Sequence, residues 1–219
     1  MLLCINHEMN GQVVPQAFLL SPVIPSVVIG TQTWMQKNLD VQTYRNGEQI
    51  AQVISNTSNP NWTSYGTNAA SAWVYNNYDA TNNVAYGKLY NFYAVNDVRG
   101  ICPVGWHVPS QAEWLVLANY SGTDTASGGK KLKETGTAHW ASSSATLATN
   151  STGFTALGGG YMGASGSSSG SLTYLGYFWT STINGFTASY IHLEDNRASI
   201  NVALNGNMTG GFSVRCIHD

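Results

Sequence analysis

Charged side chains are scarce in this sequence: only 9% of its 219 residues are Asp, Glu, Lys or Arg, whereas about a quarter is typical of soluble domains. The 9 basic and 11 acidic residues form no run of like charge, and the net charge is -2. No segment could therefore neutralise a phosphate backbone or dock on an anionic bilayer. These absences exclude nucleic acid and charged membrane surfaces from the partners that we expect.

Long apolar stretches are missing at the start of the chain. Its first residues, MLLCINHE, contain neither a basic segment nor an apolar run long enough for a secretory signal or a membrane span. We therefore expect no direct membrane insertion. If Met1 is the natural start, we expect the protein to reach the outside as part of a larger particle such as a phage. The alternative is that a longer protein was trimmed.

Cysteine is rare too. Three residues, Cys4, Cys102 and Cys216, allow at most one bridge within the chain, and we predict that Cys102 and Cys216 form it. No Cys-x-x-Cys pair and no Cys/His spacing indicates a zinc site. We predict neither a bound metal ion nor another cofactor.

Neutral polar and aromatic residues are what the sequence has in quantity, with 12 tyrosines and 7 tryptophans among many Asn, Ser, Thr and Gly. Recognition surfaces use this mixture, because aromatic rings give contact area at little entropic cost and amides and hydroxyls adapt their hydrogen bonds. The alternative is an ordinary fold with a polar turn at every strand end.

The chain divides into an arm and one domain. Residues 1–28 contain Pro15, Pro22 and Pro25 between short apolar runs, which predicts an extended arm rather than a helix. Such an arm favours homo-oligomerisation or docking on a larger particle, although an edge strand of the same domain fits equally well. Residues 29–219 alternate short β-rich stretches with Asn, Gly and Ser turns, as one domain of this size can.

Two segments interrupt the β-rich pattern with helical signals. Residues 86–96 place apolar side chains such as Leu89 and Phe92 at helical intervals and predict a short amphipathic helix. Ser110 and Glu113 form a capping box that opens a second helix, which runs through about residue 120. We expect its buried stripe to be Trp114, Leu117 and Ala118.

Glycine marks the expected turns. Gly128-Gly129 and Asn205-Gly206 both predict turns, the second of them a two-residue hairpin. The chain then closes with a strand, residues 210–216, whose alternate residues share one buried face.

Seven blocks of sequence carry a family resemblance. In order they are residues 29–39 (IGTQTWMQKNL), 86–96 (YGKLYNFYAVN), 102–114 (CPVGWHVPSQAEW), 131–136 (KLKETG), 153–157 (GFTAL), 178–182 (FWTST) and 211–216 (GFSVRC). With this order and spacing, residues 29–219 resemble the Fibrobacter succinogenes major paralogous domain, which is widespread in surface proteins of Bacteroidetes and in their phages.

The resemblance implies an α+β fold of the C-type-lectin-like class, related to formylglycine-generating enzymes, with two short helices flanking small, twisted antiparallel sheets. Some members of this broad group are variable proteins of diversity-generating retroelements, which rewrite codons just before a closing strand such as residues 211–216. The corresponding window is 183–210, and it is rich in asparagine. A divergent paralogue without hypervariability would have the same sequence features.

Side chains of this window form the candidate ligand-binding surface. We expect Phe186, Tyr190 and Met208 to be its apolar anchors, with polar residues around them. The predicted ligand-binding residues are Asn184, Phe186, Thr187, Ser189, Tyr190, His192, Glu194, Asn196, Arg197, Asn201, Asn205, Asn207 and Met208.

Scaffold residues should behave differently from window residues. Truncation of Trp179, Phe212 or Val214 is expected to cost roughly 3 kcal/mol as a core large-to-small change. Truncation of Tyr190 is expected to affect binding alone.

Catalysis has little support in the sequence, and we predict no catalytic residue. The oxidase branch of the fold uses two closely placed cysteines, whereas this chain supplies only Cys216 there. A hydrolase would need a nucleophile with a base or two facing carboxylates. We assign His107 and His139 to structural roles, and we interpret residues 194–196 (EDN) as a solvated turn rather than a cation site.

We therefore predict a non-catalytic ligand- or receptor-binding protein, displayed on a phage particle or, alternatively, on a bacterial cell surface. Its expected ligand is a host-surface protein or glycan. One alternative is a structural phage component, a capsid decoration or tail protein that uses the window for subunit contacts. A formylglycine-generating type of enzyme is the less favoured alternative.

Overall fold

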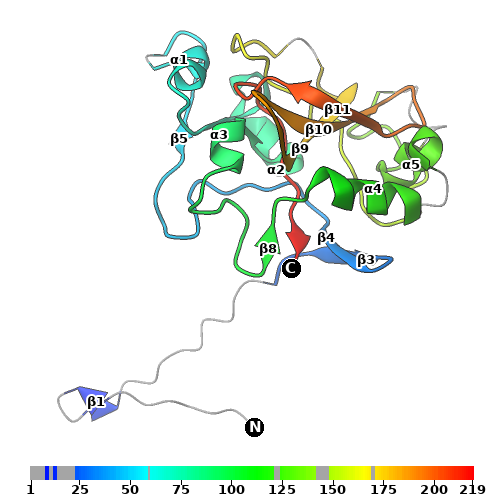
Figure 1. The fold of residues 1–219 in the computed structure, drawn as a ribbon, viewed down its shortest axis with the longest axis horizontal. Coiled ribbons are helices and arrows are strands. Elements are labelled where there is room, and N and C mark those ends of the chain that lie inside the picture. The colour runs from blue at the N-terminus through cyan, green and yellow to red at the C-terminus, as the bar shows by residue number, and fades with distance from the viewer. Residues whose placement is uncertain are drawn as a thin grey trace.

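The computed structural model describes residues 8–9, 12–13, 23–58, 60–120, 124–141, 148–168 and 171–219. It is an α+β fold with several small sheets and few helices (Figure 1), which confirms the predicted class. The strands are β1 (Glu8–Met9), β2 (Gln12–Val13), β3 (Ser26–Ile29), β4 (Gln32–Met35), β5 (Ala51–Gln52), β6 (Ala72–Val74), β7 (Leu89–Tyr90), β8 (Trp106–His107), β9 (Leu175–Asn184), β10 (Thr187–Glu194), β11 (Asn201–Gly206) and β12 (Ile217–His218). The helices are α1 (Trp62–Thr67), α2 (Asn83–Tyr86), α3 (Phe92–Val95), α4 (Gln111–Tyr120) and α5 (Asp124–Leu132), with short 3-10 turns η1 (Asn76–Tyr78) and η2 (Ala80–Asn82).

The first and last strands of the domain lie in one sheet, of order β3-β4-β12-β8. Ile217 of β12 pairs antiparallel with Trp34 of β4 on one side and with His107 of β8 on the other. The two ends of the domain therefore meet, at the lower edge of the domain in Figure 1, near the C label. Residues 26–28, which the sequence assigned to the arm, belong to β3 and pair with β4, so the domain begins earlier than residue 29.

A second sheet, β11-β10-β9, contains most of the predicted window and is antiparallel throughout. The turn between β9 and β10 is the two-residue loop of Gly185 and Phe186, in which Gly185 has a φ of 59° that glycine adopts without strain. The predicted turn at Asn205-Gly206 is wrong, because both residues lie in β11. The Asn-Gly signal that does form a hairpin is Asn184-Gly185.

A third sheet, of order β5-β6-β7, contacts the closing segment through a bridge between Tyr90 and Phe212. Part of it falls in the segment 86–96, where the sequence predicted one helix. The chain instead forms β7 and then the one-turn helix α3, which Asn91 caps by accepting a hydrogen bond from the Ala94 amide. Leu89 and Phe92 are both buried, as the pattern predicts, but they belong to two different elements, β7 and α3.

The capping box of α4 is present. The Ser110 Oγ accepts a hydrogen bond from the Glu113 amide at 3.2 Å, and the Glu113 carboxylate accepts one from the Ser110 amide at 2.7 Å. The expected stripe of Trp114, Leu117 and Ala118 is buried. The predicted turn at Gly128-Gly129 is wrong, because both glycines lie inside α5.

Two large apolar clusters form the core. One surrounds Trp179 and Phe212 and includes the bridge between Cys102 and Cys216, which confirms the predicted disulfide. The other surrounds Trp34 and Trp114 and lies beneath the sheet of β9–β11. Trp179, Phe212 and Val214 are buried, in agreement with their assignment to the scaffold.

Arg215 ties the closing segment to two other parts of the chain. Its guanidinium is fully buried and donates hydrogen bonds to the Asn38 side chain at 2.7 Å and to the backbone carbonyls of Phe154 and Thr155. It also lies over the Phe154 ring at 4.3 Å. Burial lowers the pKa of Arg215 to about 9, so the group keeps its charge at neutral pH.

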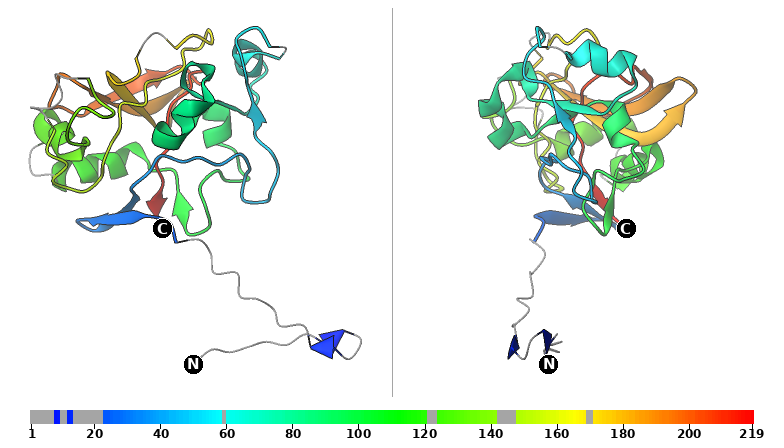
Figure 2. Two further views of the ribbon diagram at one scale, coloured as in Figure 1. Left: turned by 180° about the vertical axis from the view of Figure 1, so that it is seen from behind. Right: turned by 90° about the vertical axis from the view of Figure 1, so that its left-hand side faces the viewer.

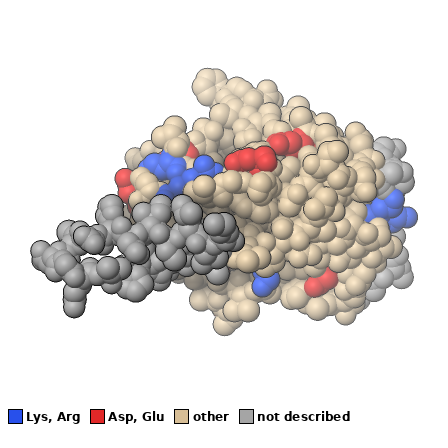
Figure 3. Space-filling model, turned by 90° about the horizontal axis from the view of Figure 1, so that it is seen from below, with Lys and Arg blue, Asp and Glu red and all other residues tan. Residues whose placement is uncertain are grey.

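Charged side chains are few on the face of the domain that Figure 3 shows, in keeping with the composition. In the view of Figure 3, the acidic and basic side chains form small, separate groups on a largely neutral face. Within the described part of the chain, no helix has both the length and the apolar character needed to cross a membrane.

The predicted arm lies mostly outside the described residues. Within it, β1 and β2 pair antiparallel with each other. Its proposed role in oligomerisation stays a prediction.

Candidate functional site

The sheet of β9–β11 sorts the predicted window residues onto two faces. His192 of β10 stands opposite Tyr177 of β9 and Asn201 of β11, and Tyr190 stands opposite Trp179 and Ala203. Because side chains alternate along a strand, these residues share one face. The views in Figures 1 and 2 show this sheet as a twisted layer on one side of the domain.

The opposite face of the sheet is anchored in the core. Phe178, Ile191 and Leu193 are fully buried there, and α4 packs against β9 and β10. The rings of Phe178 and Trp114 lie 5.5 Å apart. The sheet is thus a rigid support for the side chains on its other face.

Aromatic rings line the outer face. Tyr177 stacks on Tyr190 with ring centroids 5.3 Å apart and on His192 with centroids 5.1 Å apart, and both pairs are close to parallel. Phe212 lies 5.0 Å from both tyrosine rings, and Tyr161 lies 4.9 Å from Tyr177. The half-buried rings of the three tyrosines and His192, together with the buried ring of Phe212, form one continuous wall.

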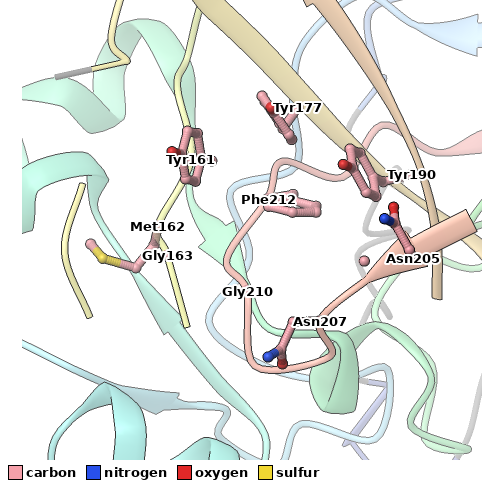
Figure 4. A pocket seen from close by; sticks show the side chains of 10 residues that line it. Tyr161, Met162, Gly163, Tyr177, Tyr190, Asn205, Asn207, Gly210 and Phe212 are labelled. Carbon is pink, nitrogen blue, oxygen red and sulfur yellow. The ribbon is translucent and has the colours of Figure 1, made fainter. Parts of the chain in front are cut away.

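This wall borders a hollow of about 240 Å³. Figure 4 shows it between the segment of Tyr161 and Met162 on one side and β10, β11 and the closing segment on the other. Asn205 and Asn207 bring side-chain amides to it. Its lining residues are Tyr161, Met162, Gly163, Tyr177, Tyr190, Asn205, Gly206, Asn207, Gly210 and Phe212.

Glycine at position 206 is required by the packing of this wall. A Cβ atom there would lie 2.8 Å from Cδ1 of Tyr190 and 2.9 Å from Cζ3 of Trp179, closer than such atoms approach. The glycine that was expected to make a turn instead leaves room for two aromatic rings.

Tyr177 and Tyr190 can act as hydrogen-bond donors at physiological pH. Burial raises the pKa of Tyr177 to about 12, with further contributions from Tyr190, Tyr161 and Glu194. Burial also raises the pKa of Tyr190 above its usual value. Both phenols therefore stay protonated and neutral.

The charges nearest to the wall are paired with each other. The Glu194 carboxylate lies 3.3 Å from Nε2 of His192 and 2.9 Å from Nε of Arg197, and it accepts a hydrogen bond from Asn201. Burial lowers the pKa of His192 and outweighs the opposing effect of Glu194. The histidine is therefore mainly neutral at pH 7.

Lys133 fixes the turn that follows β10. Its buried ammonium donates hydrogen bonds to the backbone carbonyls of Glu194 at 2.8 Å, Asp195 at 3.1 Å and Arg197 at 2.8 Å. Burial lowers its pKa to about 8, against the attraction of Asp195 and Glu194. The predicted solvated turn at 194–196 is wrong in part, because Asp195 is buried.

The structure gathers some of the predicted binding residues and separates others. Tyr190, His192, Glu194, Asn201, Asn205 and Asn207 lie on or beside the aromatic wall. Ser189 is fully buried at a bulge in β10 and cannot reach a ligand.

Other predicted residues lie away from the wall. Phe186 is 99% exposed at the hairpin tip, where the Thr187 hydroxyl donates a hydrogen bond to the backbone carbonyl of Asn184. Asn196 and Arg197 lie in the turn after β10, and Met208 packs partly on the core.

Tyr190 has a larger structural role than expected. Its ring contacts those of Tyr177, Trp179 and Phe212, so its truncation would loosen packing as well as remove a contact. The prediction that truncation affects binding alone is therefore wrong.

Apart from Phe212, which was assigned to the scaffold, four residues that line the hollow lie outside the window and were missed from the sequence: Tyr161, Met162, Gly163 and Tyr177. Tyr177 precedes the window on β9, and its alternation with Trp179 is a signal that could have placed it on the same face. Tyr161 comes from a segment without regular secondary structure, and no local pattern indicates that it meets Tyr177.

Two other histidines, His107 and His139, are held by carboxylates. His107 lies between Glu113 at 2.8 Å and Asp219 at 2.7 Å, and His139 lies 2.8 Å from Glu134. Among the described residues, no group of three or more His, Cys, Asp or Glu side chains is arranged to hold a metal ion.

A family model for the Fibrobacter succinogenes major domain matches residues 27–218 of the chain. The chain belongs to this family. The match covers nearly the whole described domain, from β3 to β12, and confirms the resemblance in the seven sequence blocks. No curated protein and no solved structure matches the chain.

Within this Fibrobacter succinogenes major domain, several of the seven blocks form the frame of the site. Block 178–182 supplies Trp179, block 211–216 supplies Phe212 and Arg215, and block 131–136 supplies Lys133. Side chains from segments far apart in the sequence therefore support the aromatic wall and the amides beside it.

Proposed function

We propose that the chain is a non-catalytic ligand- or receptor-binding protein with a C-type-lectin-like fold, and that the outer face of β9–β11 is its binding surface. The observation that carries the proposal is the aromatic hollow. It joins Tyr190, Asn205 and Asn207 of the predicted window to the fixed Tyr177 on a sheet anchored in the core. Concave sites with apolar walls and a few polar groups are typical of ligand binding.

The fold assignment within the α+β class has independent support. The strands at both ends of the domain pair in one sheet, and α4 and α5 contact each other beside the sheet of β9–β11. The pairing of the two ends in one sheet agrees with the close termini that the family resemblance implies for a C-type-lectin-like domain, and so supports the proposed fold.

Display outside the cytosol, on a phage particle or a bacterial surface, is also proposed. The Cys102–Cys216 bridge supports it, because disulfides persist mainly in oxidising environments. The sparse charge of the surface favours neutral contacts over binding to nucleic acid.

Adsorption of the labelled full chain to a panel of intact bacterial cells tests the binding function. We expect the double variant Asn205→Ala/Asn207→Ala to lose adsorption, because both amides line the hollow. Asn46→Ala is the matched control, since Asn46 is an exposed asparagine in the turn 44–48 and should adsorb like the wild type. Equal adsorption of all three proteins would contradict the proposal and favour a structural role in subunit contacts.

A further inference from the structure

The hollow has no charged side chain in its lining. Tyrosine, phenylalanine, methionine, glycine and asparagine make up its wall. The nearest charged group on the sheet, the Glu194 carboxylate, is already bound by His192, Arg197 and Asn201. A charged ligand would lose its hydration on entering the hollow and would find no group of opposite charge there. The lining therefore selects a neutral ligand.

The size of the hollow limits the ligand to one ring or a short segment. Its volume of about 240 Å³ is below the range of about 300–1,000 Å³ that is usual for drug-sized ligands. The hollow opens to solvent, so a larger molecule could extend out of it.

Apolar and polar groups are arranged on different sides of this space. Tyr161 and Tyr177 provide ring surface at one side, whereas Asn205 and Asn207 bring amides to the other. The Asn207 Oδ1 accepts a hydrogen bond from the Thr209 amide at 2.9 Å, which fixes the side chain and leaves its NH₂ group as a donor. A sugar ring has the matching structure, with an apolar face of C–H groups and an edge of hydroxyls that both donate and accept.

We infer that the hollow binds a single neutral pyranose ring of a glycan, stacked on the tyrosine wall and hydrogen-bonded by Asn205 and Asn207, without a metal ion. This inference rests on the proposed binding function and specifies its ligand class. Tyr161 and Tyr177 lie outside the window 183–210 and would recognise the ring itself. The window residues Tyr190, Asn205 and Asn207 would discriminate between sugars.

Saturation-transfer NMR with the full chain tests the inference. The probes are the methyl glycosides of glucose, galactose, mannose and N-acetylglucosamine, with glucuronate and glucosamine as charged comparators. We expect at least one neutral glycoside to bind with a dissociation constant on the order of 1 mM, equally well in excess EDTA, and the charged comparators to bind more weakly.

Two variants assign the signal to the hollow. Tyr161→Ala and Asn207→Ala should each weaken binding about tenfold, as the loss of a central contact does. Tyr174→Ala is the matched control, because Tyr174 is a 53% exposed tyrosine outside the lining and should bind like the wild type. A melting curve for each variant shows that it is folded.

Three results would overturn the inference: no transfer from any neutral glycoside, loss of binding in EDTA, or unchanged binding by both hollow variants. If no sugar binds while cell adsorption still requires Asn205 and Asn207, the ligand is a protein and the binding function stands. If adsorption is also independent of these residues, the proposed function fails with the inference.

Discussion

Arg215 joins three segments of the chain through its side chain alone. Its hydrogen bonds to Asn38, Phe154 and Thr155 require the planar guanidinium, which a lysine cannot replace. We predict that Arg215→Lys lowers the free energy of unfolding by about 3 kcal/mol, because a buried charge then has fewer partners. Urea denaturation measures the change.

Arg197 provides the matched control for this substitution. Its side chain is 63% exposed and pairs with Glu194 at the surface. Arg197→Lys should change the free energy of unfolding by less than about 0.5 kcal/mol. Equal stability of Arg215→Lys and the wild type would show that the buried network is not needed for the fold.

His107 makes the stability of the domain depend on pH. Burial lowers its pKa, but hydrogen bonds to Glu113 and Asp219 outweigh burial and raise it above 6.5. The stability from protonated His107 is therefore fully present below pH 6.5 and is lost as the pH rises through the raised pKa. The pKa of Glu113 is lowered below 4.5, because its hydrogen bonds to Ser110 and His107 outweigh burial. Its contribution is therefore lost only in stronger acid.

The variant His107→Gln tests this linkage. We predict that its melting temperature falls furthest below that of the wild type near pH 5–6. The difference should shrink toward pH 9. A difference in melting temperature that is constant over this range would mean that the charge on His107 contributes nothing to stability.

At the scale of elements, α5 shows why glycine patterns mislead. Gly129 lies within the helix, and a Cβ atom there would lie 2.2 Å from the backbone carbonyl oxygen of Ser199 and 2.9 Å from that of Ala198. The glycine is needed for close approach of two backbones, not for a turn. Gly206 in β11 is likewise needed for close packing, in its case against the Ala188 carbonyl and the rings of Tyr190 and Trp179.

Gly129→Ala separates these two roles of glycine. In an exposed helix this substitution would stabilise by about 1 kcal/mol, but here we predict a loss of about 1–3 kcal/mol from the clash. Lys130→Ala, at the next position of α5, is the control and should stay within about 0.5 kcal/mol of the wild type. Stabilisation by Gly129→Ala, measured by urea denaturation, would contradict the packing at Ser199.

Elements with local signals could be predicted from the sequence, and those that depend on distant partners could not. The capping box of Ser110 and Glu113 needs only four residues, and α4 begins where it indicates. Segment 86–96 has a helical pattern, but Leu89 and Tyr90 pair with β6 instead. Competition from a neighbouring strand is not visible within the segment itself.

At the scale of the whole molecule, the disulfide closes most of the domain. It joins Cys102 to Cys216, which are 114 residues apart in the sequence, and so it restricts the unfolded chain strongly. We predict that Cys102→Ala/Cys216→Ala destabilises the protein by about 2–5 kcal/mol. Melting curves with and without dithiothreitol check this result. The reductant should lower the melting temperature of the wild type but not that of the variant, and an unaffected wild type would contradict the prediction.

About half of the residues that line the candidate site could be located from the sequence. The window before the closing block located Tyr190, Asn205 and Asn207, because family resemblance and strand alternation are readable along the chain. Tyr161 and Tyr177 join them only through packing between segments far apart. The sequence contains no local signal for that contact.

Deep sequencing of this locus in its natural population tests most directly whether the outer face is a variable binding surface on a fixed frame. The account predicts dense substitution within codons 183–210, at outward positions such as His192 and Asn205, while the inward Ile191 and Leu193 stay unchanged. Uniformly low variation, or equal variation on both faces of β10, would contradict it and favour a structural role in assembly.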